Sequence, residues 1–143
     1  MPRIKLDIIA DEVLADPPVI NIISHDYSDR PVESIKVICY SYLETFAEKI
    51  RALKERTRPR DLYDVVNLYH KSKNTDISGK LYNLLKIKCE FKKISVPKLG
   101  ELDLYKQDCE SGWNKQLSHQ LNDLPEFKKF WDELVDFFDW LER

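Results

Sequence analysis

The sequence lacks the features of a membrane protein, a disulfide-bonded protein or a zinc protein. It contains no apolar run near the roughly 18 residues that cross a bilayer, and its amino terminus has no apolar stretch of the signal-peptide type. The three cysteines, Cys39, Cys89 and Cys109, lie far apart and form no Cys-x-x-Cys pair. We therefore expect a cytoplasmic protein without a membrane partner, whose thiols are buried as small hydrophobic side chains.

Clustered histidines and a large net charge are missing as well. None of the three histidines falls in a His-Glu-x-x-His arrangement, so the sequence offers no protein-only transition-metal site. The net charge of -2 excludes a uniformly basic protein that coats nucleic acid. The charge is nevertheless uneven, because six basic residues and one acid lie between Lys49 and Arg60, whereas the segment after Asn122 is acidic. These basic residues are spread around a helix, which disfavours a DNA-recognition helix.

What the sequence does contain indicates an α+β fold in one domain spanning residues 1–143. Hydrophobic residues make up 43% and charged residues 34% of the chain, as in a globular protein with a core. Alternating polarity predicts a strand over Ile4–Ile9, and two short apolar runs predict strands over 19–23 and 35–40. Residues 1–40 are therefore expected to form a small sheet, and residues 41–143 a helical bundle.

Caps and 3.6-residue spacing predict where the helices begin and end. Ser41 and Glu44 have capping-box spacing. The serine hydroxyl would accept a hydrogen bond from a first-turn amide, and the glutamate side chain would accept one from the amide of the cap residue. This helix is expected to end near Arg56, and Pro59 is expected to open the next one. Further helices are predicted over 80–91, over 102–121 with an interruption near Gly112, and from residue 125 onward.

Four charged side chains are candidates for chemistry, and each has a structural alternative. Lys49 lies roughly 60° from the centre of the apolar stripe of its helix, where it either covers apolar surface with its stem or contacts a ligand. Asp61 and Asp64 share one side of the following helix, where they either complement the helix dipole or contribute to a site. Asp7 stands on the polar face of the first predicted strand and either meets solvent or binds a metal. From the residues alone, both interpretations stay open at each position.

Two of these regions together resemble a known family. The run Glu48–Leu53 is Glu-Lys-Ile-Arg-Ala-Leu and, after a short basic spacer, the run Arg60–Val65 is Arg-Asp-Leu-Tyr-Asp-Val. This pair resembles the signature of the AbiEii/AbiGii toxin family, in which a helix with Glu-Lys-x-x-Ala-Leu is followed by Arg-Asp-x-x-Asp. The segment Ile4–Ile8 and the late Trp113 resemble further parts of the family's layout.

The resemblance implies a nucleotidyltransferase of the polymerase-β type, with a partial nucleotidyltransferase sheet at the amino terminus. Such enzymes transfer a nucleotide from an NTP to an acceptor with the help of Mg²⁺. Lys49 would then contact the nucleotide phosphates, together with Arg56 and Arg60, although Arg60 could instead pair with an acid. Asp64, with Asp61 as the alternative, would be the family's essential late aspartate and would orient the lysine or the acceptor.

The same resemblance assigns a role to Asp7 and names partners. Asp7 would be the third carboxylate of the family's sheet, acting as a metal ligand or general base. The implied partners are an NTP, an RNA acceptor and an antitoxin protein. If the strand over Ile4–Ile9 has no neighbours, its free edge favours a homodimer through this strand.

The sequence departs from the family where the catalytic metal would bind. The family carries Gly-Ser followed by spaced aspartates, but the only glycines here are Gly79, Gly100 and Gly112, all downstream of the Lys49 segment. Since one carboxylate does not hold two metals, we expect this polypeptide to be inactive as a transferase on its own. It would be a fragment of a longer enzyme, a non-catalytic protein that binds nucleotide, RNA or a partner, or a helical interaction domain with a coincidental signature.

Overall fold

Strands come first along the described part of the chain and helices follow, as the sequence predicted. The computed structural model describes residues 8, 10–24, 28–29 and 32–143. In chain order the elements are β1 (Val19–Ile22), β2 (Lys36–Cys39), α1 (Tyr42–Arg56), α2 (Pro59–Ser72), α3 (Ser78–Phe91), α4 (Leu99–Leu102), the 3-10 helix η1 (Asp103–Tyr105), α5 (Lys106–Leu117) and α6 (Phe127–Leu141). The predicted fold class is confirmed: a small antiparallel sheet precedes a part of the chain that is predominantly helical.

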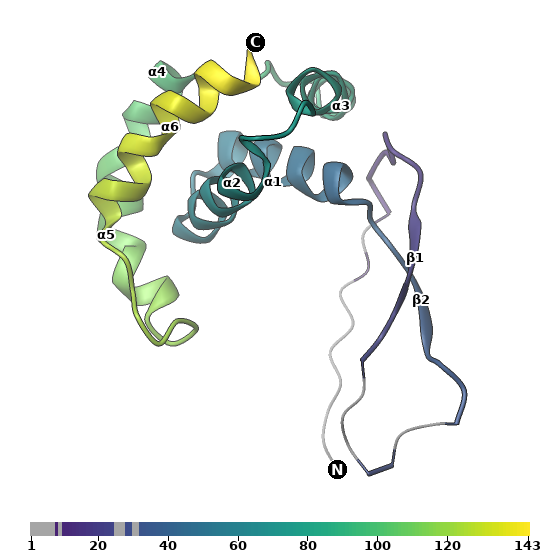
Figure 1. The fold of residues 1–143 in the computed structure, drawn as a ribbon. Helices are drawn as coiled ribbons and strands as arrows, with labels where there is room; N and C mark the ends of the chain where they lie inside the picture. Colours follow the sequence, from purple (N-terminus) through teal and green to yellow (C-terminus); the bar gives the residue numbers. More distant parts are fainter. Residues whose placement is uncertain (1–7, 9, 25–27, 30–31) are drawn as a thin grey trace.

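The sheet is a hairpin of β1 and β2 that extends away from the helices (Figure 1). Ile20 pairs with Ile38 across it, and both side chains are largely exposed, as is Ile22 two residues further along. Because side chains alternate along a strand, these three isoleucines share one face. No described residue covers this face, and nearly all of the strand predicted over Ile4–Ile9 lies outside the described residues.

Helix α1 begins at a serine cap, but the glutamate of the predicted capping box does something else. Ser41 Oγ accepts from the amide of Glu44 at 3.0 Å, as predicted. The Glu44 carboxylate does not return to Ser41; its Oε2 accepts from the amides of Ala15 at 3.2 Å and Asp16 at 2.9 Å. The prediction was wrong because the segment before the hairpin crosses the start of α1 and offers two amides there. The helix ends at Arg56 and is capped by Thr57 in the left-handed conformation, with φ 39°.

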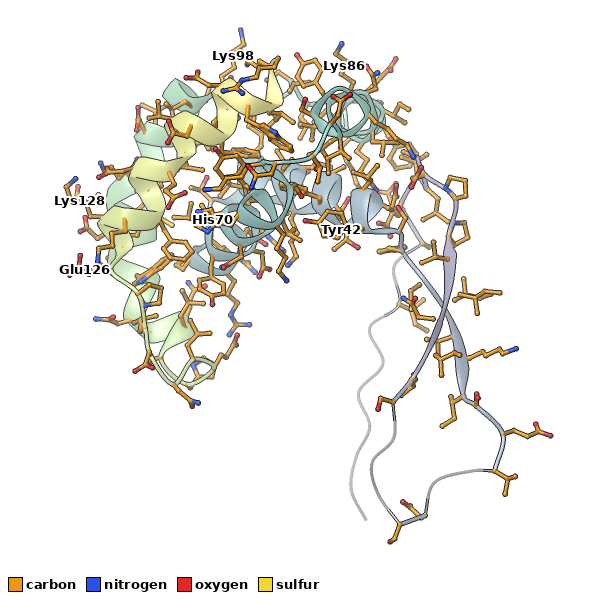
Figure 2. All side chains as sticks on the ribbon, viewed as in Figure 1. Tyr42, His70, Lys86, Lys98, Glu126 and Lys128 are labelled. Carbon is orange, nitrogen blue, oxygen red and sulfur yellow. The ribbon has the colours of Figure 1, made fainter. Side chains whose placement is uncertain are left out.

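The core lies where α1, α2 and α6 meet. Phe46 of α1 stacks on Phe137 and Trp140 of α6, with ring centroids 6.0 Å and 6.2 Å apart. Tyr69 of α2 meets the same two rings, at 5.8 Å and 5.5 Å. Next to Tyr69 on α2 lies His70, which is labelled in Figure 2. It forms a hydrogen bond with Glu133 of α6. Aromatic packing therefore fixes α2 relative to α1, and these are the helices that carry the signature residues.

Glycine does not interrupt the helix predicted over 102–121. Gly112 lies inside α5, and the break falls earlier, at the 3-10 turn η1. A Cβ built on Gly112 would come within 3.3 Å of Pro59 Cγ and 3.1 Å of Gln116 Nε2. The expectation of an interruption near Gly112 was wrong because the glycine serves a close approach of α5 to the start of α2.

Two of the three cysteines are buried core residues, as expected. Cys89 and Cys109 are each 1% exposed, whereas Cys39 on β2 is only partly buried. Burial raises the pKa of the Cys89 thiol to about 11 and that of Cys109 to about 12. In the described part of the chain, none of the helices is both long and apolar enough to span a bilayer.

Candidate functional site

Helices α1 and α2 bring the two signature runs face to face. Lys49 Nζ lies 2.6 Å from Asp64 Oδ2 and 3.9 Å from Asp61 Oδ1. The Lys49 side chain is 33% exposed and that of Asp64 is 38% exposed, which places the lysine at the border of the buried face, as its helical position predicts. An ion pair so open to water contributes only about 0–1 kcal/mol. Lys49 is thus held by Asp64, but weakly.

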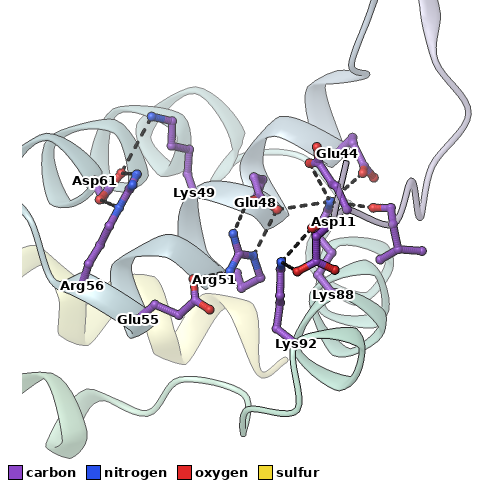
Figure 3. A network of polar contacts seen from close by, with 12 residues as sticks. Asp11, Glu44, Glu48, Lys49, Arg51, Glu55, Arg56, Asp61, Lys88 and Lys92 are labelled. Carbon is purple, nitrogen blue, oxygen red and sulfur yellow. Dashed lines mark hydrogen bonds and ion pairs between the residues drawn. The ribbon is translucent and has the colours of Figure 1, made fainter. Parts of the chain in front are cut away.

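A second pair, which is bidentate and involves a buried carboxylate, closes the turn between the two helices. Arg56 donates from Nε to Asp61 Oδ2 at 2.7 Å and from Nη2 to Asp61 Oδ1 at 3.0 Å (Figure 3). Asp61 is 1% exposed, so both of its oxygens are used inside the protein. The hydrogen bonds that Arg56 donates to the Asp61 carboxylate raise the pKa of Arg56. A bidentate pair of this kind is stronger than a single contact, and it makes Asp61 a structural carboxylate.

Around these pairs lies a cleft of about 480 Å³. Its lining residues come from α1, from α2 and from the end of α5 with the turn after it: Lys49, Arg56, Arg58, Arg60, Asp61, Tyr63, Asp64, Leu117, Gln120 and Leu121. Four of them are basic and two are acidic, so the cleft has a formal excess of two positive charges. Because the whole chain carries a net charge of -2, this is a local positive site suited to an anion.

Two arginines of the cleft are not neutralised by its acids. Arg60 donates from Nε to the backbone carbonyl of Gln116 at 3.4 Å and pairs with neither aspartate. Arg58 is exposed, and its side chain forms no ion pair or hydrogen bond with any residue that the structure describes. Sequence reasoning counted Arg58 among the basic residues without assigning it a role. Gln120 had no signal in the sequence, since only tertiary packing brings it to the cleft.

On the other side of α1 lies a buried network that the sequence did not predict. Lys88 of α3 is 1% exposed, and its Nζ lies 2.6 Å from Oε1 of the fully buried Glu44 (Figure 3). The same ammonium donates to the carbonyl of Val13 at 3.1 Å and lies 3.3 Å from Glu48 Oε2. Since Glu44 also accepts the amides of Ala15 and Asp16, the network ties the segment before the hairpin to two helices.

Glu48, the first residue of the signature, belongs to this network and not to the cleft. It accepts hydrogen bonds from Arg51, which also pairs with Glu55. Burial pushes the pKa of Glu48 upward, but the hydrogen bond and charge of Arg51, with the charge of Lys88, outweigh it and hold this pKa below its ordinary value. Adjacent signature residues therefore serve different sites: Glu48 joins the buried network and Lys49 lines the cleft.

Comparison with known proteins assigns a family to this arrangement. The family model of the nucleotidyl transferase AbiEii toxin, of a type IV toxin–antitoxin system, matches residues 1–140. The chain belongs to the AbiEii family. The match confirms the resemblance seen in the paired signature, so a coincidental motif on an unrelated helical domain is excluded. Comparisons with curated proteins and with solved structures gave no match.

The AbiEii family is one of nucleotidyltransferases, for which Mg²⁺ is typical. Mg²⁺ requires several oxygen ligands in octahedral geometry. Asp61 has both oxygens on Arg56, Asp64 pairs with Lys49, and no group of three His, Cys, Asp or Glu side chains in the described ranges is placed to hold a metal. These residues do not fit Mg²⁺. Asp7 lies outside the described residues, and its role as a metal ligand stays a prediction.

Proposed function

We propose that the cleft between α1, α2 and the end of α5 binds the phosphates of an NTP, as the phosphate-binding part of a toxin–antitoxin nucleotidyltransferase. The observation that carries this proposal is the position of Lys49. The signature lysine lines a cleft with excess positive charge, and the pair that holds it to Asp64 is open to water. A phosphate can therefore replace the aspartate at little cost.

The side chains of the cleft would contact a phosphate chain in different ways. Lys49 supplies a compact charge to the phosphate oxygens. Arg60 supplies a guanidinium whose one hydrogen bond to a described residue is long, at 3.4 Å. Asp64 orients Lys49 before a nucleotide enters. Arg56, for which the resemblance implies a phosphate contact, donates one N–H from Nε and one from Nη2 to Asp61. The two N–H groups of Nη1 and the second one of Nη2 are left to contact a ligand.

Replacing Lys49 by alanine tests this proposal. Lys49→Ala is expected to weaken NTP binding by about 10- to 100-fold, the range of a charge-assisted hydrogen bond of roughly 1.5–3 kcal/mol. Isothermal titration of the 143-residue chain with each NTP measures the effect. Lys71→Ala, at an exposed site near the other end of α2, is the matched control and should bind as the wild type does. Absence of NTP binding by the wild type would refute the proposal.

We also propose that these 143 residues do not transfer a nucleotide by themselves. The sequence contains no Gly-Ser followed by spaced aspartates, and the carboxylates of the cleft are engaged by basic side chains. Incubating the purified chain with labelled NTPs and total RNA is expected to give no labelled product. Incorporation of label above a Lys49→Ala control would contradict this.

Two further expectations about partners stay predictions. An RNA acceptor fits the excess positive charge of the cleft, and RNA retention on filters at low salt would detect it. A homodimer through the strand predicted over Ile4–Ile9 also stays a prediction, since nearly all of that strand lies outside the described residues. A monomer in sedimentation velocity would count against it. The antitoxin partner rests on the family, which is that of a type IV toxin–antitoxin system.

A further inference from the structure

We propose that Arg58 is a further phosphate-binding residue of the cleft, and that Asp64 is a displaceable counter-ion that occupies Lys49 until an anionic ligand takes its place. This inference rests on the proposed phosphate-binding function. It adds how the positive charge of the cleft is partly balanced before a ligand binds, and it names a phosphate-binding arginine to which the sequence assigned no role. Of the four basic residues of the cleft, Arg56 is committed to Asp61 and Lys49 is reversibly occupied by Asp64, whereas Arg58 and Arg60 pair with no carboxylate among the described residues.

Arg56 is the committed cation. Its guanidinium makes two hydrogen bonds to a carboxylate that is 1% exposed. Taking Asp61 away from Arg56 would leave a buried carboxylate without its partner, which is costly. A ligand phosphate therefore leaves this pair in place, and Arg56 contributes to the site mainly by fixing the turn on which Arg58 stands.

Arg58 is the cation of the cleft whose side chain has no partner among the described residues. It occupies the N-cap position of α2, where its carbonyl accepts the amides of Asp61 at 3.0 Å and Leu62 at 3.1 Å. Its backbone is thus fixed by the helix, while its side chain lines the cleft without an ion pair or side-chain hydrogen bond to any described residue. Arg56 and Arg60 flank it at two-residue spacing and line the same cleft, but of the three only Arg56 is paired with a carboxylate among the described residues. An anion would balance the charges of Arg58 and Arg60.

Asp64 is the reversible counter-ion because its environment makes release cheap. Its side chain is 38% exposed and makes its ion pair at 2.6 Å with a lysine that is itself 33% exposed. The aspartate can return to water without leaving a buried charge behind. As long as it stays, it lowers the positive charge of the cleft and competes with the ligand for Lys49. Removing its charge should therefore strengthen anion binding, the opposite of what a ligand-contacting residue would do.

Titration with inorganic tripolyphosphate, without metal, tests the inference on the 143-residue chain. Arg58→Gln is expected to weaken binding about tenfold, as for one charge-assisted contact, and to reduce the salt dependence of the affinity. Asp64→Asn is expected to tighten binding about two- to fivefold, the range of an exposed ion pair. Lys71→Gln is the control with no expected change, and circular dichroism verifies that each variant is folded.

A double-mutant cycle separates a local counter-ion from a distant charge. If Asp64 acts by occupying Lys49, Asp64→Asn loses most of its effect in a Lys49→Gln background. An undiminished effect in that background, a weaker affinity of Asp64→Asn, or an unchanged affinity of Arg58→Gln would each overturn the inference while leaving phosphate binding intact. Absence of any tripolyphosphate binding by the wild type would instead overturn the proposed function itself.

Discussion

Replacing Lys88 by alanine is expected to lower the free energy of unfolding by about 3–5 kcal/mol, the cost of breaking a buried ion pair. The ammonium of Lys88 is 1% exposed and pairs at 2.6 Å with Glu44, which is fully buried. Without it, the Glu44 carboxylate and the carbonyl of Val13 each lose a donor in a place that water scarcely reaches. Urea denaturation, compared at equal m-values, measures the loss.

Two matched variants show whether the loss comes from an uncompensated charge. Lys86→Ala removes an exposed lysine on the same helix whose ammonium lies 4.5 Å from the centre of the Tyr82 ring, and should change stability by at most about 1 kcal/mol. The double variant Glu44→Gln with Lys88→Met removes both charges and keeps an oxygen for the amides of Ala15 and Asp16, so it should recover most of the stability. If Lys88→Ala is as stable as Lys86→Ala, the buried pair does not anchor the fold.

A charge-reversed pair distinguishes an anchor for the segment 13–16 from a simple contact between helices. Glu44→Lys with Lys88→Glu keeps opposite charges together but places no acceptor at the amides of Ala15 and Asp16. We expect these two amides to exchange hydrogen faster in the reversed variant than in the wild type, while amides of α2 keep their protection. Unchanged exchange at both amides would show that Glu44 does not hold this segment.

Truncation of Phe137 is expected to cost about 3–5 kcal/mol, as for a large aromatic side chain lost from a core. This ring is fully buried and packs on Phe46 of α1 at 6.0 Å and Tyr69 of α2 at 5.8 Å. Phe137→Ala would leave a cavity between the helices that carry Lys49 and Asp64. Thermal and urea unfolding measure the cost, with Val135→Ala, on the exposed side of the same helix, as the control.

The same truncation bears on the cleft. Because α6 packs against α2 through these rings, loosening it should weaken NTP binding even under conditions where Phe137→Ala remains folded. A variant with unchanged stability would contradict the view that the aromatic cluster holds α1, α2 and α6 together.

Local patterns predicted the elements well, and tertiary contacts account for the errors. The strands near residues 19–22 and 36–39 and the helices α1 and α2 follow from polarity, caps and proline position. The role of Glu44 could not be predicted, because its partners Ala15 and Lys88 lie far from it in the sequence. The same is true of Gly112, whose position against Pro59 depends on how α5 packs.

For the site as well, local patterns predicted which face of a helix a residue occupies, but not which side chain it pairs with. The helical position of Lys49 indicated the border of the buried face, and only the resemblance to the family implied that Asp64 orients this lysine, to which the structure joins it. The spacing of Asp61 and Asp64 indicated that both lie on one side of α2. Their spacing could not show that Asp61 belongs to Arg56, since that depends on the turn between the helices. Arg58 was overlooked because an unpaired cation leaves no pattern in a sequence that is rich in basic residues around it.

The most direct test of the account is to locate bound nucleotide on the chain by NMR. Addition of an NTP to the ¹⁵N-labelled protein is expected to shift amide signals in the segments 58–64 and 117–121, which contain most of the residues that line the cleft of Lys49. The signals of residues 88–92, beside the buried network on the other side of α1, should stay in place. Shifts confined to residues 88–92, or no shifts at a nucleotide concentration that saturates binding, would contradict the assignment of the phosphate site.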